Sequence, residues 1–261
     1  MLTTILYFLI VLFATTLGAC AGIGGGIIIK PFMDFLNYDD IATISFYSAN
    51  AVFAMACFSS FKRLRKNRDF NFKIIIAISL SSIIGGLLGN YAFSKLIYLL
   101  GSVNVKALQS LCLCILMLFI ISYYLIKFKS HHITNILAVS LIGIILGFIS
   151  AFLSIGGGPA NVAAYSWLFG FNVKISVTYS IATILFAQGA QLLHIALSYG
   201  YSAFNYTTLF FIIPAALLGG VIGSKIYQKI NERHIKYLLI SVMIFVLILN
   251  AYNLFNILIT K

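Results

Sequence analysis

Two runs of three glycines, at residues 24–26 and 156–158, lie inside strongly apolar sequence and constrain the fold more than any other feature. The spacing between them recurs further along the chain, because Ser48 and Ser180, each preceded by a tyrosine, are separated by the same offset of 132 residues. Glycine is a poor helix former, and each unpaired backbone group in lipid costs several kcal/mol. Breaks at equivalent places in two halves of a membrane protein therefore predict a binding site.

The composition assigns the chain to the membrane. Of its 261 residues, 62% are hydrophobic and only 8% are charged, whereas soluble domains carry about 25% charged residues. Residues 1–22 lack the basic start and the spaced small residues of a secretory signal peptide, so we expect them to form the first transmembrane segment. The four cysteines lie in apolar segments without metal-ligand spacing, so neither a disulfide framework nor a metal site is expected.

Eight apolar segments have about the 20 residues that a helix needs to cross a bilayer. They fall near residues 2–22, 41–61, 72–93, 107–128, 133–153, 175–198, 204–226 and 236–257. Two shorter pieces follow the glycine runs, near 27–38 and 159–171, and as helices they would rise roughly 18 Å, less than the ~30 Å hydrocarbon core. The sequence thus predicts an all-α polytopic membrane protein, a single domain over 1–261 with a first repeat at 1–128 and a second at 133–257.

The net charge of +12 arises from 17 Lys and Arg residues against 5 Asp and Glu residues. Basic cytoplasmic loops that contact anionic lipid explain this excess better than nucleic acid binding does. An anionic substrate is a secondary inference from the same charge. If the two short pieces do not cross the membrane, the two halves run parallel and the basic residues divide almost evenly between the two sides.

If each short piece completes a fifth passage instead, the two halves are inverted. The basic loops at 62–73, 127–132 and 225–236 then share the inner side with Lys30 and Lys174, and few basic residues remain outside. Because cytoplasmic loops carry an excess of Lys and Arg, this alternative is favoured. It also puts both termini on the outer side.

The glycine runs have the chemistry of an anion site. Glycine lets backbone N–H groups approach a ligand closely, and a helix that begins after the run points free N–H groups and its positive dipole end at the same place. Pro159 fits such a start, since proline is favoured in the first helical turn. Alternatively, the glycines only let helices cross closely, as we expect for the Gly-Gly-x-x-Gly segments that start at Gly85 and Gly219. A nucleotide P-loop is excluded because no Gly-Lys-Ser/Thr follows either run.

Polar residues inside the spans extend the candidate site. Gln188, Gln191 and His194 recur every three residues and therefore share one helix face, where hydrogen bonding between helices is the alternative role. Because no Asp or Glu lies well inside a long span, we expect any coupling to run through His194, Asp34, backbone carbonyls or the protonation of the substrate, and passive transport driven by the membrane potential stays open. The candidate substrate-binding residues are Gly22, Gly24, Gly25, Gly26, Ser48, Asn50, Ser154, Gly156, Gly157, Gly158, Thr178, Ser180, Gln188 and Gln191.

These motifs resemble the sulfite exporter TauE/SafE family of bacterial membrane permeases. The resemblance rests on the segment Gly-Ala-Cys-Ala-Gly-Ile-Gly-Gly-Gly at 18–26, followed by Pro31, and on Ser-Ile-Gly-Gly-Gly at 154–158. The polar spans that begin near Ala42 and Ser176 also fit, so the resemblance covers essentially the whole chain. It implies a multi-pass transporter in the bacterial inner membrane that moves sulfite, sulfonates or related sulfur-containing anions.

The leading hypothesis is therefore a permease or secondary transporter for a small anion. The alternatives are a non-transporting membrane scaffold or assembly factor, and a transporter for an unrelated small solute. An enzyme is not expected, because no cluster of His, Asp or Cys at ligand spacing lies inside the spans. The expected partners are the anion and the lipid bilayer; no cofactor and no nucleic acid are expected, and homo-oligomerisation stays open.

Overall fold

The computed structural model of the protein describes residues 2–66, 71–126, 129–153, 157–198, 204 and 206–259. This part of the chain contains ten α-helices and no strands, as the apolar pattern predicts. The first half holds α1 (Leu2–Ala21), α2 (Gly26–Leu36), α3 (Ile41–Lys66), α4 (Phe72–Leu100) and α5 (Ser102–Ile126). The second half holds α6 (Ile136–Phe152), α7 (Gly158–Leu168), α8 (Val173–Ser198), α9 (Tyr206–Lys229) and α10 (Glu232–Ile259).

The helix lengths define a polytopic membrane protein. Within the described residues, seven helices are long and apolar enough to cross a bilayer. The span predicted near 133–153 is the shorter helix α6, with 17 residues, or about 25 Å at 1.5 Å per residue. The two short pieces after the glycine runs are α2 and α7, with 11 residues each. Large apolar side chains such as Leu88, Leu197 and Phe210 are exposed, as expected for surfaces that contact lipid.

The helices pair in a pattern that is preserved when the two halves are exchanged. Helix α4 packs against α6, and α1 against α9, which are equivalent pairs; α3 packs against α8, and α5 against α10. Small residues allow the closest approaches, since Gly85 of α4 lies against the backbone of Ile144 in α6, and Gly219 of α9 against that of Leu12 in α1. The prediction that the Gly-Gly-x-x-Gly segments serve close helix packing is confirmed.

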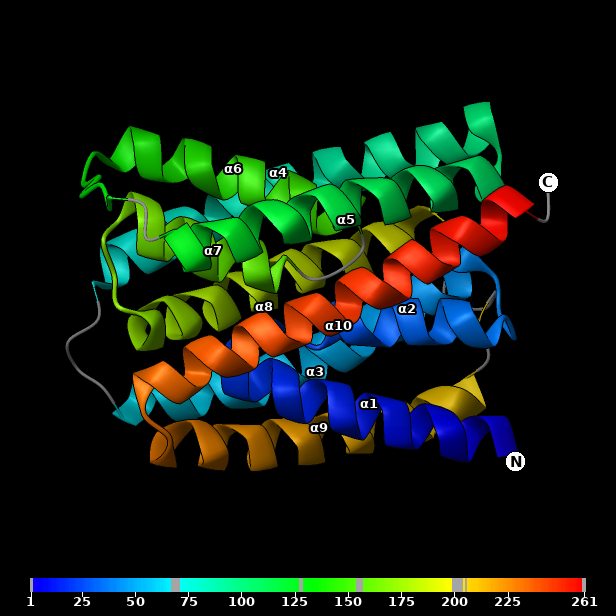
Figure 1. The fold of residues 1–261 in the computed structure, drawn as a ribbon, viewed down its shortest axis with the longest axis horizontal. Helices are drawn as coiled ribbons and strands as arrows, with labels where there is room; N and C mark the ends of the chain where they lie inside the picture. The colour runs from blue at the N-terminus through cyan, green and yellow to red at the C-terminus, as the bar shows by residue number, and fades with distance from the viewer. Residues whose placement is uncertain are drawn as a thin grey trace.

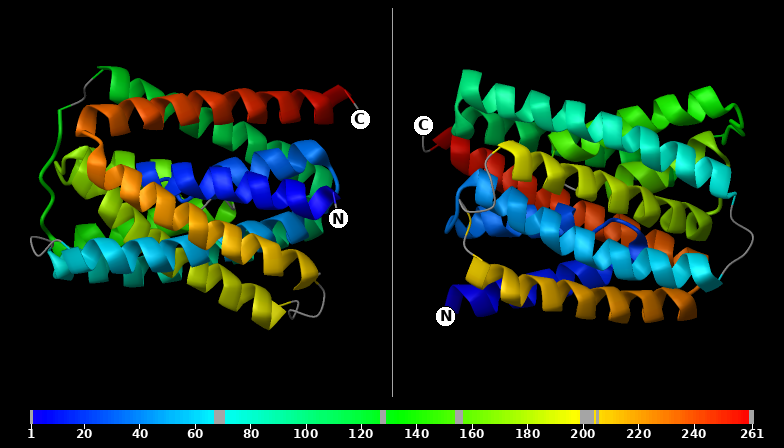
Figure 2. Two further views of the ribbon diagram at one scale, coloured as in Figure 1. Left: turned by 90° about the horizontal axis from the view of Figure 1, so that it is seen from below. Right: turned by 180° about the vertical axis from the view of Figure 1, so that it is seen from behind.

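The directions of the helices show how the two halves are related. Both termini lie at one end of the bundle, in Figure 1 and in both views of Figure 2. Helices α1, α3 and α5 run away from that end, whereas their counterparts α6, α8 and α10 run toward it (Figure 1). Helices α3, α5 and α9 end, and α4, α6 and α10 begin, at the opposite end (Figure 1), as the charge distribution favours. The halves are inverted, and we name the end with the termini outer and the opposite end inner.

Two basic residues of the charge count do not lie in loops. The prediction that Lys30 joins the loop cations on the inner side is wrong, because its side chain is only 2% exposed and donates to groups of α5 and to the end of α6. Arg63, counted with the basic loop at 62–73, is 4% exposed. A buried cation needs hydrogen-bond acceptors, and both side chains reach backbone carbonyls of other helices.

Candidate functional site

Both interrupted helices break at the glycine runs. Between α1 and α2, Gly22, Gly24 and Gly25 have φ angles of 76°, 82° and 74°, and Gly157, just before α7, has a φ of 64°. This left-handed region is strained for residues with a side chain, so the glycines make the sharp turns possible. Pro159 lies in the first turn of α7, as its helix-start preference predicts.

The two breaks touch each other in the interior. Gly158 lies so close to the backbone of Ile23 that a Cβ atom at this position would overlap it. Ser180 of α8 joins the two breaks, because its Oγ donates to the Gly22 carbonyl at 2.7 Å and lies 3.3 Å from the Gly158 carbonyl. Gly22 also packs against Val177 of the same helix. The inverted arrangement thus brings two distant segments of the chain to one place.

The helices that follow the breaks begin inside the protein without a side-chain cap. Helix α2 begins at Gly26 and α7 at Gly158, and neither N-cap residue, Gly25 or Gly157, has a capping side-chain hydrogen bond. All four glycines are buried. The first N–H groups of a helix have no partner within it, and the helix dipole places about half a positive charge there. Two adjacent ends of this kind can offer several backbone donors to one small anion.

Two polar side chains beside the second break were missed by the sequence reasoning. Ser150 of α6 and Asn161 of α7 both lie next to Gly157, and each is 2% exposed. Ser150 Oγ and Asn161 Oδ1 have no hydrogen-bond partner among the described residues. At the repeat offset of 132 residues, Ser150 corresponds to Gly18 and Asn161 to Ile29. Polar residues that replace small or apolar ones between repeats are the signal that could have identified them.

The remaining candidates are distributed over α3 and α8. Ser48, Gln188 and Gln191 are buried, whereas Asn50 and His194 are half-buried. The Asn50 side chain donates to the Phe46 carbonyl of its own helix at 2.9 Å. Ser154 and Gly156 lie outside the described residues. The described part holds no group of three or more His, Cys, Asp or Glu side chains that could bind a metal ion.

Two other candidates make contacts away from the breaks. The Thr178 hydroxyl lies 3.1 Å from the Tyr227 hydroxyl and 3.3 Å from the Lys174 carbonyl. Asp34 forms an ion pair with Lys106 of α5 at 3.1 Å. These contacts join Thr178 to α9 and Asp34 to α5, and in the described structure neither side chain forms a hydrogen bond with a glycine run.

The end of α6 is held by a buried polar cluster that the sequence did not indicate. Lys30 Nζ donates to Gln109 Oε1 at 2.6 Å and to the Leu153 carbonyl at 3.3 Å, and Gln109 Nε2 donates to the Phe152 carbonyl at 2.6 Å. The last carbonyls of a helix lack intrahelical partners and carry its negative dipole end. A cation from α2 and an amide from α5 therefore stabilise the interrupted end of α6.

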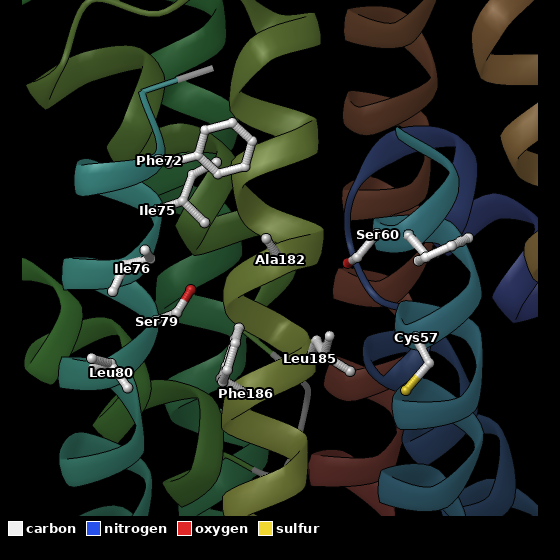
Figure 3. A pocket seen from close by; sticks show the side chains of 11 residues that line it. Cys57, Ser60, Phe72, Ile75, Ile76, Ser79, Leu80, Ala182, Leu185 and Phe186 are labelled. Carbon is white, nitrogen blue, oxygen red and sulfur yellow. The ribbon is translucent and has the colours of Figure 1, made fainter. Parts of the chain in front are cut away.

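A cavity of about 440 Å³ lies between α3, α4 and α8, and Figure 3 shows its lining. Most of the side chains are apolar, such as Phe72, Leu80 and Phe186. Ser60 and Ser79 also line it, and their hydroxyls have no hydrogen-bond partner in the described part. An apolar lining does not compensate an anion for its lost hydration. The lining therefore suits an apolar occupant better than an anion.

Inverted halves with interrupted helices that meet in the protein interior are an architecture typical of membrane transporters. Comparison with known proteins agrees, because the family model of the sulfite exporter TauE/SafE matches residues 7–249. The chain belongs to this family of membrane transport proteins.

Two relatives extend the similarity over most of the chain. A probable membrane transporter protein of Methanocaldococcus jannaschii is 28% identical over 246 residues, which cover 87% of each chain. A probable membrane transporter protein of Bacillus subtilis is 24% identical over 264 residues, covering 90% of this chain and 92% of the relative. No solved structure matches the chain significantly.

Proposed function

We propose that the protein is a permease that moves a small anion through a site between its two interrupted helices. The observation that carries this proposal is the contact between the start of α7 and the break that leads into α2, together with the lack of a side-chain cap at both buried helix starts. Backbone N–H groups at such starts remain without intrahelical acceptors, and an anion supplies the acceptors. The family description and the names of both relatives support a transport function.

The substrate class that we propose is a sulfur-containing oxyanion such as sulfite or a sulfonate. The name of the family supports it, and so does the chemistry of the donors, because several N–H groups suit an anion with several oxygens. We assign the four glycines at the helix starts, with Gly22, Gly24, Ser48 and Ser180, to this site. Gln188 and Gln191 extend it along α8, whereas His194 and Asp34 are candidates for coupling to an ion.

The proposed setting is a bacterial inner membrane, which the chain crosses several times. We take residues 1–128 and 133–257 as the two repeats of one transport domain. The exchange pattern of the helix pairs supports this division. Both interrupted helices then approach the middle of the membrane from opposite sides, which gives a ligand at the breaks a route from either face.

The test measures flux of labelled sulfite, a sulfonate and thiosulfate in proteoliposomes that contain the purified protein. We expect Gly25→Ala and Gly157→Ala to impair transport, because both positions have positive φ and an alanine there is strained by about 1–2 kcal/mol. Gly86→Ala is the matched control, since its Cβ would meet its nearest neighbour at an ordinary 3.7 Å. Normal flux in well-folded Gly25 and Gly157 variants would reject the backbone site.

The same assay separates the competing functions. A well-folded wild-type protein that moves none of the three anions would favour a membrane scaffold. Flux of a neutral or cationic solute in place of the anions would favour a transporter for an unrelated small solute.

A further inference from the structure

Arg63 is a buried cation at the inner end of α3. Its Nη2 donates to the Ala19 carbonyl, near the end of α1, and its guanidinium carbon lies 3.7 Å from the ring centroid of Tyr227 in α9. The side chain is 4% exposed. The contact with Ala19 places this cation within one helical turn of Gly22, the first residue of the break with positive φ.

Most of the hydrogen-bonding capacity of Arg63 is unused. Its Nε and Nη1 atoms are buried and have no hydrogen-bond partner among the described residues. Nη2 lies between these two nitrogens and carries two N–H groups, so at least one edge of the guanidinium keeps two parallel donors. Leaving a buried donor of a charged group without an acceptor destabilises a protein. Within the described part of the chain, Arg63 therefore lacks an acceptor with two oxygens for this edge.

No carboxylate in the described part of the chain supplies this acceptor. Each of the four described acidic side chains has a partner other than Arg63. Asp34 pairs with Lys106, Asp39 accepts from Tyr7, Asp40 accepts from the Thr43 amide, and Glu232 accepts from the Val173 amide.

A second cation adds positive charge to the same place. Lys174, in the first turn of α8, has its Nζ 5.8 Å from the Tyr227 ring centroid. The Tyr227 hydroxyl donates to the Lys174 carbonyl at 2.9 Å and lies 3.1 Å from the buried Thr178 hydroxyl. Tyr227 therefore lies close to two cations. The neutral hydroxyls of Tyr227 and Thr178 lie beside them, and the Glu232 carboxylate accepts from the Val173 amide next to Lys174. The positive charge of the two cations attracts an anion.

We infer that Arg63, assisted by Lys174, forms an inner station that binds the small oxyanion one helical turn from the glycine breaks. This inference rests on the proposed transport function and adds a second anion-binding position to it. The oxyanion accepts two parallel hydrogen bonds from one edge of the guanidinium. The inner station thus lies between the basic inner loops and the place where the two breaks meet.

Sulfite transport by Arg63→Lys and Arg63→Gln in vesicles of both orientations tests the inference. We expect both changes to raise the half-saturating sulfite concentration about tenfold at the inner face and less than twofold at the outer face. The matched control is Arg233→Gln, because Arg233 also stacks on a tyrosine, Tyr237, but is exposed. Lysine can still donate to the Ala19 carbonyl, so a purely structural role predicts wild-type saturation for Arg63→Lys. That result would overturn the inference.

A binding measurement keeps this test separate from that of the transport function. Sulfite should raise the melting temperature of the purified wild-type protein and of Arg233→Gln, and should raise that of Arg63→Lys much less. If sulfite stabilises the wild type and Arg233→Gln but not Arg63→Lys, and the wild type shows no flux, the proposed transport function is rejected and the inner station is supported. If sulfite stabilises Arg63→Lys as much as the wild type, or stabilises neither, the inner station is refuted.

Discussion

The two glycine breaks share a backbone design but differ in the helix that packs against them. At the first break, Gly18 of α1 approaches the backbone nitrogen of Gly25 so closely that no side chain fits between them. At the second break, Ser150 takes the place of Gly18 and lies beside Gly157 with an unpartnered hydroxyl in the described structure. The first break is thus closed by contact between backbones, whereas the second presents a polar side chain at the same position.

The helices that follow the breaks show the same difference in polarity, with the polar side chain in the second half. Ile29 in α2 is apolar and fully buried, and its counterpart Asn161 in α7 is an equally buried amide. The cations are distributed the other way, since Lys30 and Arg63 both come from the first half and hold the ends of α6 and α1. Backbone donors therefore come from both halves, the unpartnered polar side chains beside a break come from the second, and the charges that fix the helix ends come from the first.

Breaking the contact between the two breaks should have the largest effect. In Gly158→Ala, the added Cβ would overlap the backbone of Ile23, which cannot move aside as a flexible side chain can. We expect a loss of about 3 kcal/mol of stability, at the upper end of the usual range for overpacking, together with loss of transport. Thermal unfolding in detergent and flux in proteoliposomes measure the two effects.

The control for this change is an alanine at a glycine that faces side chains instead of backbone. Gly189 meets only the ring of Phe53, at 3.3 Å, and a ring can tilt by a few tenths of an ångström. A Gly158→Ala variant as stable and active as Gly189→Ala would show that the two breaks do not depend on each other.

Local features explain what the sequence could and could not predict. The breaks, the first-turn Pro159 and the close helix crossings at Gly85 and Gly219 follow from rules about glycine and proline that need only neighbouring residues. From the sequence, Lys30 and Arg63 are counted with the basic residues of the inner side, because the positive-inside rule considers only how many cations lie on each side of the membrane. Their burial depends on carbonyls that lie 123 and 44 residues away in the sequence, and no local pattern reveals such partners.

Removing the charge of Lys30, one of the two buried cations of the first half, should have an intermediate effect on stability and transport. Lys30→Met keeps the apolar stem but leaves the Leu153 carbonyl and Gln109 Oε1 without this donor. Neutralising a buried charge can stabilise a protein. Here we expect the loss of a donor to two buried acceptors to lower the stability by more than this gain. Asp34 keeps its ion pair with Lys106, so the change leaves no carboxylate unpaired. We expect a loss of about 2 kcal/mol of stability and slower transport.

The exposed Lys95 of the same outer region provides the comparison for Lys30. Lys95→Met should leave the melting temperature and flux unchanged, since an exposed lysine loses little when its charge is removed. Equal behaviour of the two variants would mean that the end of α6 does not need its cation. The asymmetry between the halves would then be confined to the side chains at the second break.

The smallest change in stability is expected when the second break is made apolar like the first. This change also tests most directly whether the polar side chains of the second half matter. Asn161→Leu removes a buried amide whose Oδ1 has no partner in the described structure, so we expect stability to stay within about 0.5 kcal/mol or to rise. If this amide contacts the anion, the half-saturating sulfite concentration should rise about three- to tenfold. The equivalent change in the first half, Ile29→Leu, should alter neither quantity, because it exchanges one apolar side chain for another of equal volume. Unchanged saturation in Asn161→Leu would show that the backbone donors of both halves bind the anion without help from this side chain.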